Sequence, residues 1–274
     1  MRPTLTFAPL VAAYLSSLAV ADNLDPIAPS SPGHHTLLNP TPRDEWRELA
    51  PDRPDTTESP ITLDAGAWCV EASYFDWRRE SGDNTYTILA TNLKVGLTKR
   101  IDLQTVFDAY TWEDPATGPG TEGFSDVTLR LKYNVWGNDG EKTAFALFPF
   151  IKIPTDTAIS NGEVEGGLIL PFSIDLADGI GLGLMAAFDS VHNGIDDYDI
   201  EFIHSAVLGF DISERVGLYT EYVGVSGPGK DESYASGGVT YSVTEDLVFD
   251  AGIQIGLNDV AEDIGLFGGF TKRF

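Results

Sequence analysis

Apolar and polar residues alternate along most of the chain beyond Gly66, and this alternation predicts β-strands whose two faces differ. The pattern is clearest over 127–135, where odd positions are apolar or aromatic and even positions are polar. Most of the predicted strands exceed the ~5–6 residues usual in soluble proteins. Twelve strands are predicted, at 67–79, 85–98, 100–112, 124–136, 142–154, 164–176, 179–189, 198–212, 214–225, 233–243, 245–257 and 264–274.

Two kinds of connection separate these strands. Tight polar turns such as Ala177-Asp178-Gly179 alternate with longer loops, most of them acidic, expected at 80–84, 113–123, 155–163, 190–197, 226–232 and 258–263. Short turns at one end and long loops at the other are typical of transmembrane β-barrels of the outer membrane. We therefore expect an all-β, antiparallel up-and-down transmembrane β-barrel of about 12 strands, with its tight turns facing the periplasm.

The bilayer requires such a sheet to close. Hydrocarbon offers no hydrogen-bond partner to a strand edge, so the last strand should pair with the first. The last strand ends on an aromatic residue, and we predict that Gly269, Phe270 and Phe274 form the signal read by the outer-membrane assembly machinery. Lys272 stands where that signal usually has an apolar residue.

The N-terminal region differs from the rest of the chain. Arg2, an apolar run over 7–18 and the small residues Ala19-Val20-Ala21 predict a secretory signal over 1–21, cleaved after Ala21. Residues 22–65 contain eight prolines and predict an extended segment, with one short helix near 43–49. We favour a periplasmic leader for this segment, with a plug entering the barrel as the alternative, and assign 66–274 to a barrel in the outer membrane of a Gram-negative bacterial cell.

The amino-acid composition limits the binding partners and the covalent cross-links that the chain can have. A net charge of −25 argues against nucleic acid. It suits a cell surface at which divalent cations bridge anionic headgroups, so the expected partners are outer-membrane lipid and lipopolysaccharide, the assembly machinery and a small-molecule solute. Cys69 is the only cysteine, which excludes an internal disulfide.

Polar residues on the inner face of the strands are the candidates for lining the lumen, where charged side chains set selectivity. They are either the walls of an open bore or a salt-bridge network that fills a narrow barrel, and both interpretations stay open. Aromatic belts are expected from Trp68 and Trp136 at one end and from Trp77, Tyr110 and Trp112 at the other. The predicted lumen-lining residues are Asp102, Gln104, Asp108, Asp126, Arg130, Lys132, Glu221, Asp250, Gln254 and Arg273.

No catalytic residue, metal site or cofactor is predicted. Ser190 and His192 are close in sequence, but nothing places an orienting group beside them. Acidic residues gather at 189–201, but their spacing matches no EF-hand loop. We interpret this acidic stretch as a solvated surface loop.

Two stretches resemble a known family. They are Asp52-Arg53-Pro54-Asp55-Thr56-Thr57-Glu58-Ser59-Pro60, and Leu93-Lys94-Val95-Gly96-Leu97-Thr98-Lys99-Arg100-Ile101-Asp102-Leu103-Gln104 with the segment 123–137 that follows. Together they resemble the outer-membrane β-barrel transporter family associated with phenol degradation through the meta-pathway. The resemblance implies an outer-membrane channel or uptake protein, and it supplies no binding residues.

The expected function is passive passage of small solutes, aromatic or hydrophobic compounds among them, without a chemical step. The first alternative is a closed structural or surface-interaction barrel without conductance, and the second is a lipid-acting barrel hydrolase.

Overall fold

The computed structural model describes residues 34–195 and 197–274. The predicted signal sequence and residues 22–33 lie outside this described part. One compact unit spans His35–Phe274, and the description below concerns this unit. No helix within the described residues is long and apolar enough to cross a membrane.

The unit is almost entirely β-structure. It begins with a single 3₁₀ turn, η1 (Arg43–Glu45), and all of its other elements are antiparallel strands. The strands are β1 (Trp68–Glu80), β2 (Asp83–Thr98), β3 (Ile101–Asp114), β4 (Thr121–Gly123), β5 (Val127–Trp136), β6 (Thr143–Ile153), β7 (Glu165–Ala177), β8 (Ile180–His192), β9 (Tyr198–Asp211), β10 (Val216–Gly227), β11 (Lys230–Thr244), β12 (Leu247–Gly256) and β13 (Ile264–Arg273).

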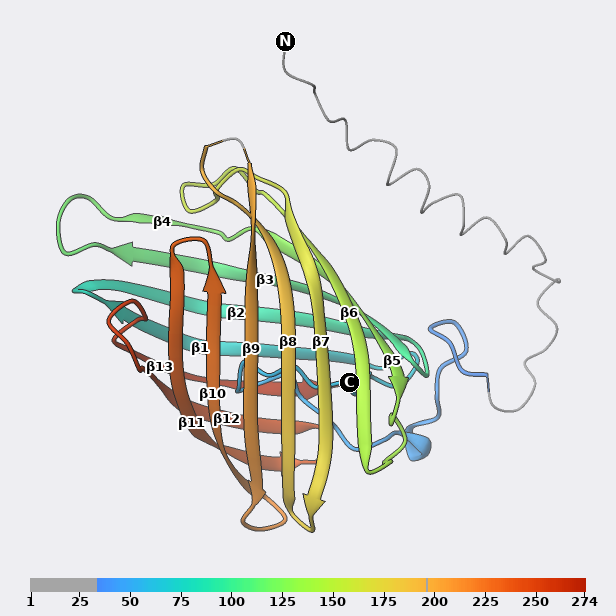
Figure 1. The fold of residues 1–274 in the computed structure, drawn as a ribbon. Helices are drawn as coiled ribbons and strands as arrows, with labels where there is room; N and C mark the ends of the chain where they lie inside the picture. The colour runs from blue at the N-terminus through green and yellow to red at the C-terminus, as the bar shows by residue number, and fades with distance from the viewer. Residues whose placement is uncertain (1–33, 196) are drawn as a thin grey trace. The chain divides into compact units, whose positions relative to one another are not determined.

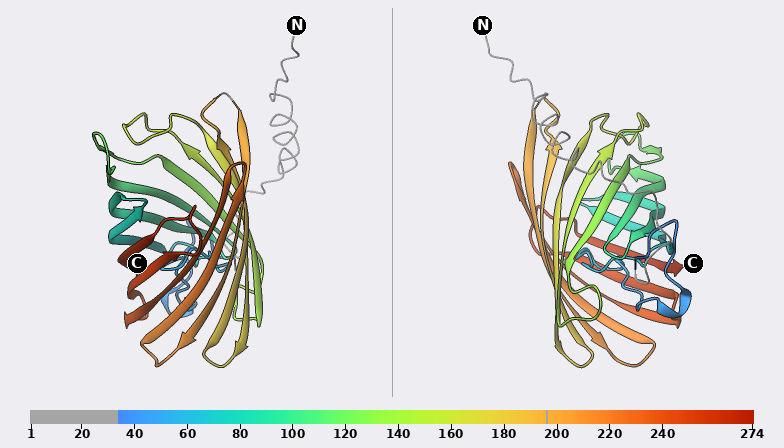
Figure 2. Two further views of the ribbon diagram at one scale, coloured as in Figure 1. Left: turned by 60° about the vertical axis from the view of Figure 1, so that its left-hand side comes forward. Right: turned by 90° about the vertical axis from the view of Figure 1, so that its right-hand side faces the viewer.

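The sheet closes on itself, as expected. Apart from the short β4, each strand pairs with its neighbours in sequence, and β5 pairs with β3. The pairings of β1 with both β2 and β13, and of β2 with β3, complete the ring (Figures 1 and 2). The result is a closed 12-stranded barrel, with β4 as an extra short strand on the edge of β3. Closure leaves no strand edge facing lipid, which is the condition that the bilayer imposes.

The two faces of the wall have opposite chemistry. On β5, Leu129 and Leu131 are 36% and 39% exposed on the outer surface, whereas Lys132 is only 1% exposed and points inward. The same contrast separates the outward Leu218 and Tyr222 of β10 from its buried Glu221. An apolar exterior around a polar interior is the arrangement of a barrel that spans a membrane.

Two expectations about the connections are wrong. The predicted loops at 80–84 and 226–232 are two-residue turns, because Gly82 and Gly229 adopt the positive φ that a tight hairpin needs. The predicted loop at 113–123 contains β4. Trp136, expected in an aromatic belt, lies on the polar parity of its strand and is nevertheless exposed on the outside, since a bulge between Asn134 and Trp136 shifts the alternation.

The two ends of the barrel differ in their connections. We call turn end the one that carries the turns at 99–100, 137–142, 178–179, 212–215 and 245–246, together with the C-terminus. The opposite loop end carries the remaining connections, including the long segments 115–126 and 154–164.

Candidate functional site: the barrel lumen

A loop that precedes the first strand occupies the inside of the barrel. Residues 47–64, called here the inner loop, contact the inward side chains of strands around most of the wall, and Figure 2 shows this segment in blue within the barrel. Sequence patterns favoured a periplasmic leader for this region, but these contacts are those of a segment inside the barrel.

Asp52 is a buried anchor of the inner loop. Its carboxylate accepts hydrogen bonds from the ammonium groups of Lys94, at 2.5 Å, and Lys132, at 2.6 Å. Lys94 also contacts Glu71 of β1 at 2.5 Å. Burial alone would raise the pKa of Asp52, but Lys132 and Lys94, with Arg130 nearby, lower it far below its usual value. The loop therefore carries a permanent negative charge into a positively charged pocket.

Further anchors lie on the opposite side of the lumen. The guanidinium of Arg53 donates to both carboxylate oxygens of Asp250 on β12, at 3.1 and 2.7 Å. The carboxylate of Glu221 on β10 accepts the backbone N–H and the hydroxyl of Thr57, at 2.8 and 2.7 Å. Charge-assisted bonds of this kind are roughly twice as strong as neutral ones. The inner loop thus bridges the lumen from β2 and β5 to β10 and β12.

The tip of the loop turns back at Glu58. Its carboxylate receives the guanidinium of Arg130 at 2.5 Å, and the same guanidinium lies 4.6 Å from the ring centre of Phe148. On the way out, the backbone N–H of Leu63 donates to Asp102, and Asp64 pairs with Arg47 at 2.8 Å. The two limbs of the loop are therefore fastened to each other near the turn end.

The predicted lumen-lining residues fall into two groups. Most of them hold the inner loop: Asp102, Gln104, Arg130, Lys132, Glu221, Asp250 and Arg273 each bond to one of its residues. The others do not contact it. Asp126 binds Thr155 and Lys152 near the loop end, Asp108 lies on β3, and Gln254 lies opposite Ser236 and Gly265.

Several functional side chains were missed by the sequence prediction. Lys94, Glu71 and Asn134 are buried inside the barrel, and strand alternation alone is sufficient to place them there. The assembly-signal residues lie on β13 and just beyond it: Gly269 faces Arg53 inside, while Phe270 stacks near Tyr74 outside. Recognition of these residues by the assembly machinery stays a prediction.

Part of the lumen is apolar, contrary to the expectation of a polar interior. Phe148, Ile169, Met185 and Ala187 form a buried cluster on β6, β7 and β8, and Phe150 and Ile203 pack against it. This patch faces a cavity of about 250 Å³ toward the loop end, called here the loop-end cavity. Thr56 and Glu58 of the inner loop form part of its boundary.

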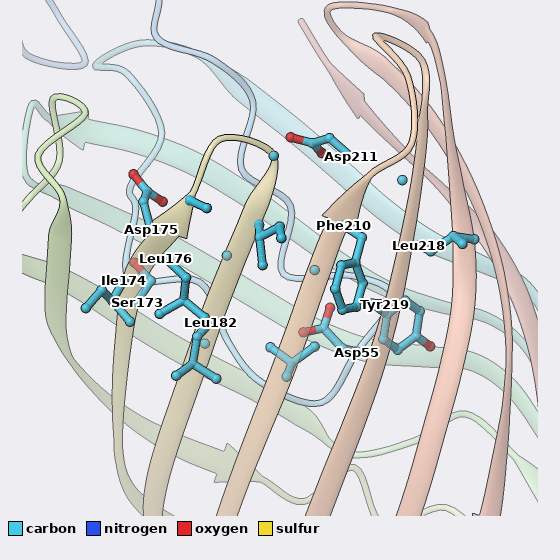
Figure 3. Close-up of a pocket in the computed structure, with 18 of the residues that line it drawn as sticks. Asp55, Ser173, Ile174, Asp175, Leu176, Leu182, Phe210, Asp211, Leu218 and Tyr219 are labelled. Carbon is cyan, nitrogen blue, oxygen red and sulfur yellow. The ribbon is translucent and has the colours of Figure 1, made fainter.

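A second cavity of about 790 Å³, called here the turn-end cavity, lies on the other side of the loop tip. Arg53, Pro54 and Asp55 border it, and Figure 3 shows Asp55 beside Tyr219 among the lining strands. Glycines at 181, 183 and 209 leave this part of the wall without side chains. Both cavities are lined by β7, β8 and β9.

The interior shows no arranged catalytic or metal-binding group within the described residues. Ser190 and His192 lie on β8, and no hydrogen bond joins their side chains in this part of the chain; the His192 ring accepts the backbone N–H of Gly194 instead. No set of three His, Cys, Asp or Glu residues among those described is placed to hold a metal ion. Cys69 is buried and free.

Comparison with known proteins agrees with this architecture. The COG4313 outer membrane channel from Pseudomonas putida F1 is 13% identical with a TM-score of 0.58, over 83% of this chain and all (100%) of that one. The NanC porin is 11% identical with a TM-score of 0.53, over 75% of this chain and 98% of that one. At these identities the likeness shows the fold alone. No curated protein matches the chain in sequence.

A family model extends the agreement from fold to sequence. The model described as "Putative MetA-pathway of phenol degradation" matches residues 51–274. The matched region begins at the inner loop and includes every strand of the barrel. The chain is therefore an outer-membrane-type β-barrel that belongs to this family.

Proposed function

We propose that this protein resides in the bacterial outer membrane, after removal of its signal sequence at Ala21, and lets small solutes pass through its lumen without a chemical step. The observation that carries the proposal is the placement of the two cavities. They lie on either side of the loop tip, and the same three strands, β7, β8 and β9, line both. A solute that crosses the barrel would follow this wall.

The attachment of the inner loop supports this route. Among the described residues, its hydrogen bonds to the barrel wall go to β1, β2, β3, β5, β9, β10, β12 and β13 and to neighbouring turns, and none goes to β6, β7 or β8. Within the described residues, the part of the wall formed by β6, β7 and β8 is thus left without a hydrogen bond to the loop. Thr57 marks the narrow point, because its hydroxyl lies 2.6 Å from Ser205 and its methyl group lies close to Gly183.

The apolar patch of the loop-end cavity supports uptake of solutes that are at least partly hydrophobic, aromatic compounds among them. Phe150, Ile169 and Met185 offer such a solute a surface that a polar lumen would not.

Recording from planar bilayers tests the proposal. The refolded protein should conduct ions in discrete steps, and proteoliposomes should take up small neutral solutes faster than empty vesicles. Absence of both conductance and uptake would instead support the alternative of a closed structural barrel. A lipase assay on the wild type and on the Ser190→Ala and His192→Ala variants, with no activity in any of them, would exclude the hydrolase.

A further inference from the structure

The loop-end cavity combines apolar walls with one unsatisfied carboxylate. We infer that it is a binding site for a small protonated amine that carries an apolar body, such as an aromatic or alkyl amine. The inference deepens the proposed channel function, on which it rests, by naming the class of solute that pauses in the lumen.

The walls provide a place for the apolar body. Phe150, Ile169, Met185 and Ile203 come from four adjacent strands, β6 to β9, and Val106 of β3 faces them. The cavity of about 250 Å³ is below the ~300–1,000 Å³ typical of sites for drug-sized ligands. One ring or a short alkyl chain is therefore the body that fits.

Asp189 of β8 provides the polar contact. It lines the cavity, and its Oδ1 atom is buried without any hydrogen-bond partner among the described residues. Burying a carboxylate oxygen without a hydrogen-bond donor costs free energy, and a donor from a ligand would remove that cost. Gly167 lies beside it on β7, and a Cβ atom there would approach Oδ1 to 2.8 Å, so the absence of a side chain leaves room next to this oxygen.

The nearby cations are committed to other carboxylates. Lys152 pairs with Glu165 at 2.6 Å, and Lys230 pairs with Glu201, the cross-strand neighbour of Asp189, at 3.4 Å. Arg130, which also borders the cavity, is held by Glu58. Asp189 forms no ion pair within the described residues, so the surroundings of its carboxylate have a surplus of negative charge that a cation would complement.

A protonated amine satisfies both parts of the site, whereas a neutral hydrocarbon leaves Asp189 unpaired and a carboxylate ligand meets Asp189 and Glu201 as like charges. The apolar body would lie against Phe150 and Met185, with the ammonium group toward β8. Because a hydrogen bond to a charged group is worth more than a neutral one, the amine should bind at least tenfold more tightly than a neutral ligand of the same shape.

Isothermal titration calorimetry on the detergent-purified, full-length protein tests the inference with three probes of similar shape: 2-phenylethylamine, ethylbenzene and phenylacetate. The wild type should bind the amine most tightly. Asp189→Asn, which keeps the shape of the side chain, should lower amine affinity roughly 10- to 100-fold and leave ethylbenzene binding unchanged. The matched control is Asp259→Asn in an exposed loop, which removes the same charge outside the cavity and should bind all three probes like the wild type.

Equal affinity of wild type and Asp189→Asn for the amine would overturn the inference, as would ethylbenzene binding as tightly as the amine in the wild type. A heat-modifiability gel shows whether each variant is a folded barrel before titration. Uptake of a neutral solute by proteoliposomes is measured in parallel and reports on the channel itself. Amine binding without uptake would support the binding site and contradict the channel function. Uptake without amine binding would support the channel function and contradict the binding site.

Discussion

Replacing Asp52 by asparagine should release the inner loop from the barrel wall. The carboxylate of Asp52 is the shared acceptor for Lys94 and Lys132, both of which are almost fully buried. In Asp52→Asn, Lys94 keeps the carboxylate of Glu71 as a partner, but Lys132 has no other ion pair within the described residues and is left with neutral contacts such as the carbonyl oxygen of Ile61 at 3.5 Å and the ring of Phe148. The variant therefore leaves one buried ammonium group without a counter-charge.

The size of the effect follows from that orphaned charge. Removing one partner of a buried ion pair costs about 3–5 kcal/mol. Each 1.4 kcal/mol changes an equilibrium constant tenfold, so the docking equilibrium of the loop should move toward release by roughly 100- to 5,000-fold. The barrel itself should persist, because its backbone ladders do not involve Asp52.

Hydrogen exchange measures this equilibrium directly. The backbone N–H groups of Thr57 and Leu63, which donate to Glu221 and Asp102, should lose protection in Asp52→Asn, while strand amides keep theirs. The open-channel current should rise in parallel.

A second substitution serves as the control for this prediction. Lys132→Met removes the orphaned charge and keeps an unbranched side chain near the ring of Phe148, so the double variant should recover part of the protection. Wild-type protection at Thr57 and Leu63 in the single variant would refute the reasoning.

Three further predictions concern the tip of the loop and the glycine-lined wall. Glu221→Gln should raise exchange at Thr57 by about 10- to 100-fold, since hydrogen bonds to a charged acceptor are worth ~1.5–3 kcal/mol; unchanged exchange would contradict the assigned anchor. Burial, with the carboxylate of Glu221 nearby, raises the pKa of Asp55 well above its usual value. The carboxyl group of Asp55 therefore binds its proton more tightly in the docked loop than in the free loop. Docking should therefore weaken as the pH rises from the usual Asp range through that raised pKa, and Asp55→Asn should flatten the dependence; an equally steep pH profile of exchange in that variant would contradict it. Gly181→Leu combined with Gly209→Leu fills space in which no atom lies within 4 Å of the new Cβ, so the variant should fold normally and conduct several-fold less, and wild-type conductance would argue against the route along this wall.

Strand alternation was sufficient for the barrel and for much of its lining. It placed Asp102 and Lys132 on the inner face because each lies between apolar or aromatic neighbours that face lipid. Alternation alone would turn Trp136 inward, and its outward position, which the expected aromatic belt requires, depends on a bulge that no local signal in the sequence marks. Alternation of apolar and polar residues predicts which side chains face the lumen only where the strand pairing has no bulge.

Two parts of the site were beyond this kind of inference. The inner loop is rich in proline and has no period, and its partners are remote: Thr57 and Glu221 are separated by 164 positions. The apolar patch lies on β6, where residues 144–151 are apolar on both parities, so alternation cannot tell the lipid face from the lumen. Phe148 is 0% exposed, and only the closed ring shows that it points inward.

The wide sequence separation of these anchors has a consequence for biogenesis. Arg53 forms hydrogen bonds with Asp250, which lies 197 positions further along the chain. Asp250 belongs to β12, the penultimate strand in the sequence. The segment is made early during synthesis, and its anchors on β10 and β12 can form only after those strands have been made. The complete set of anchors therefore forms only in a barrel whose last strands are in place.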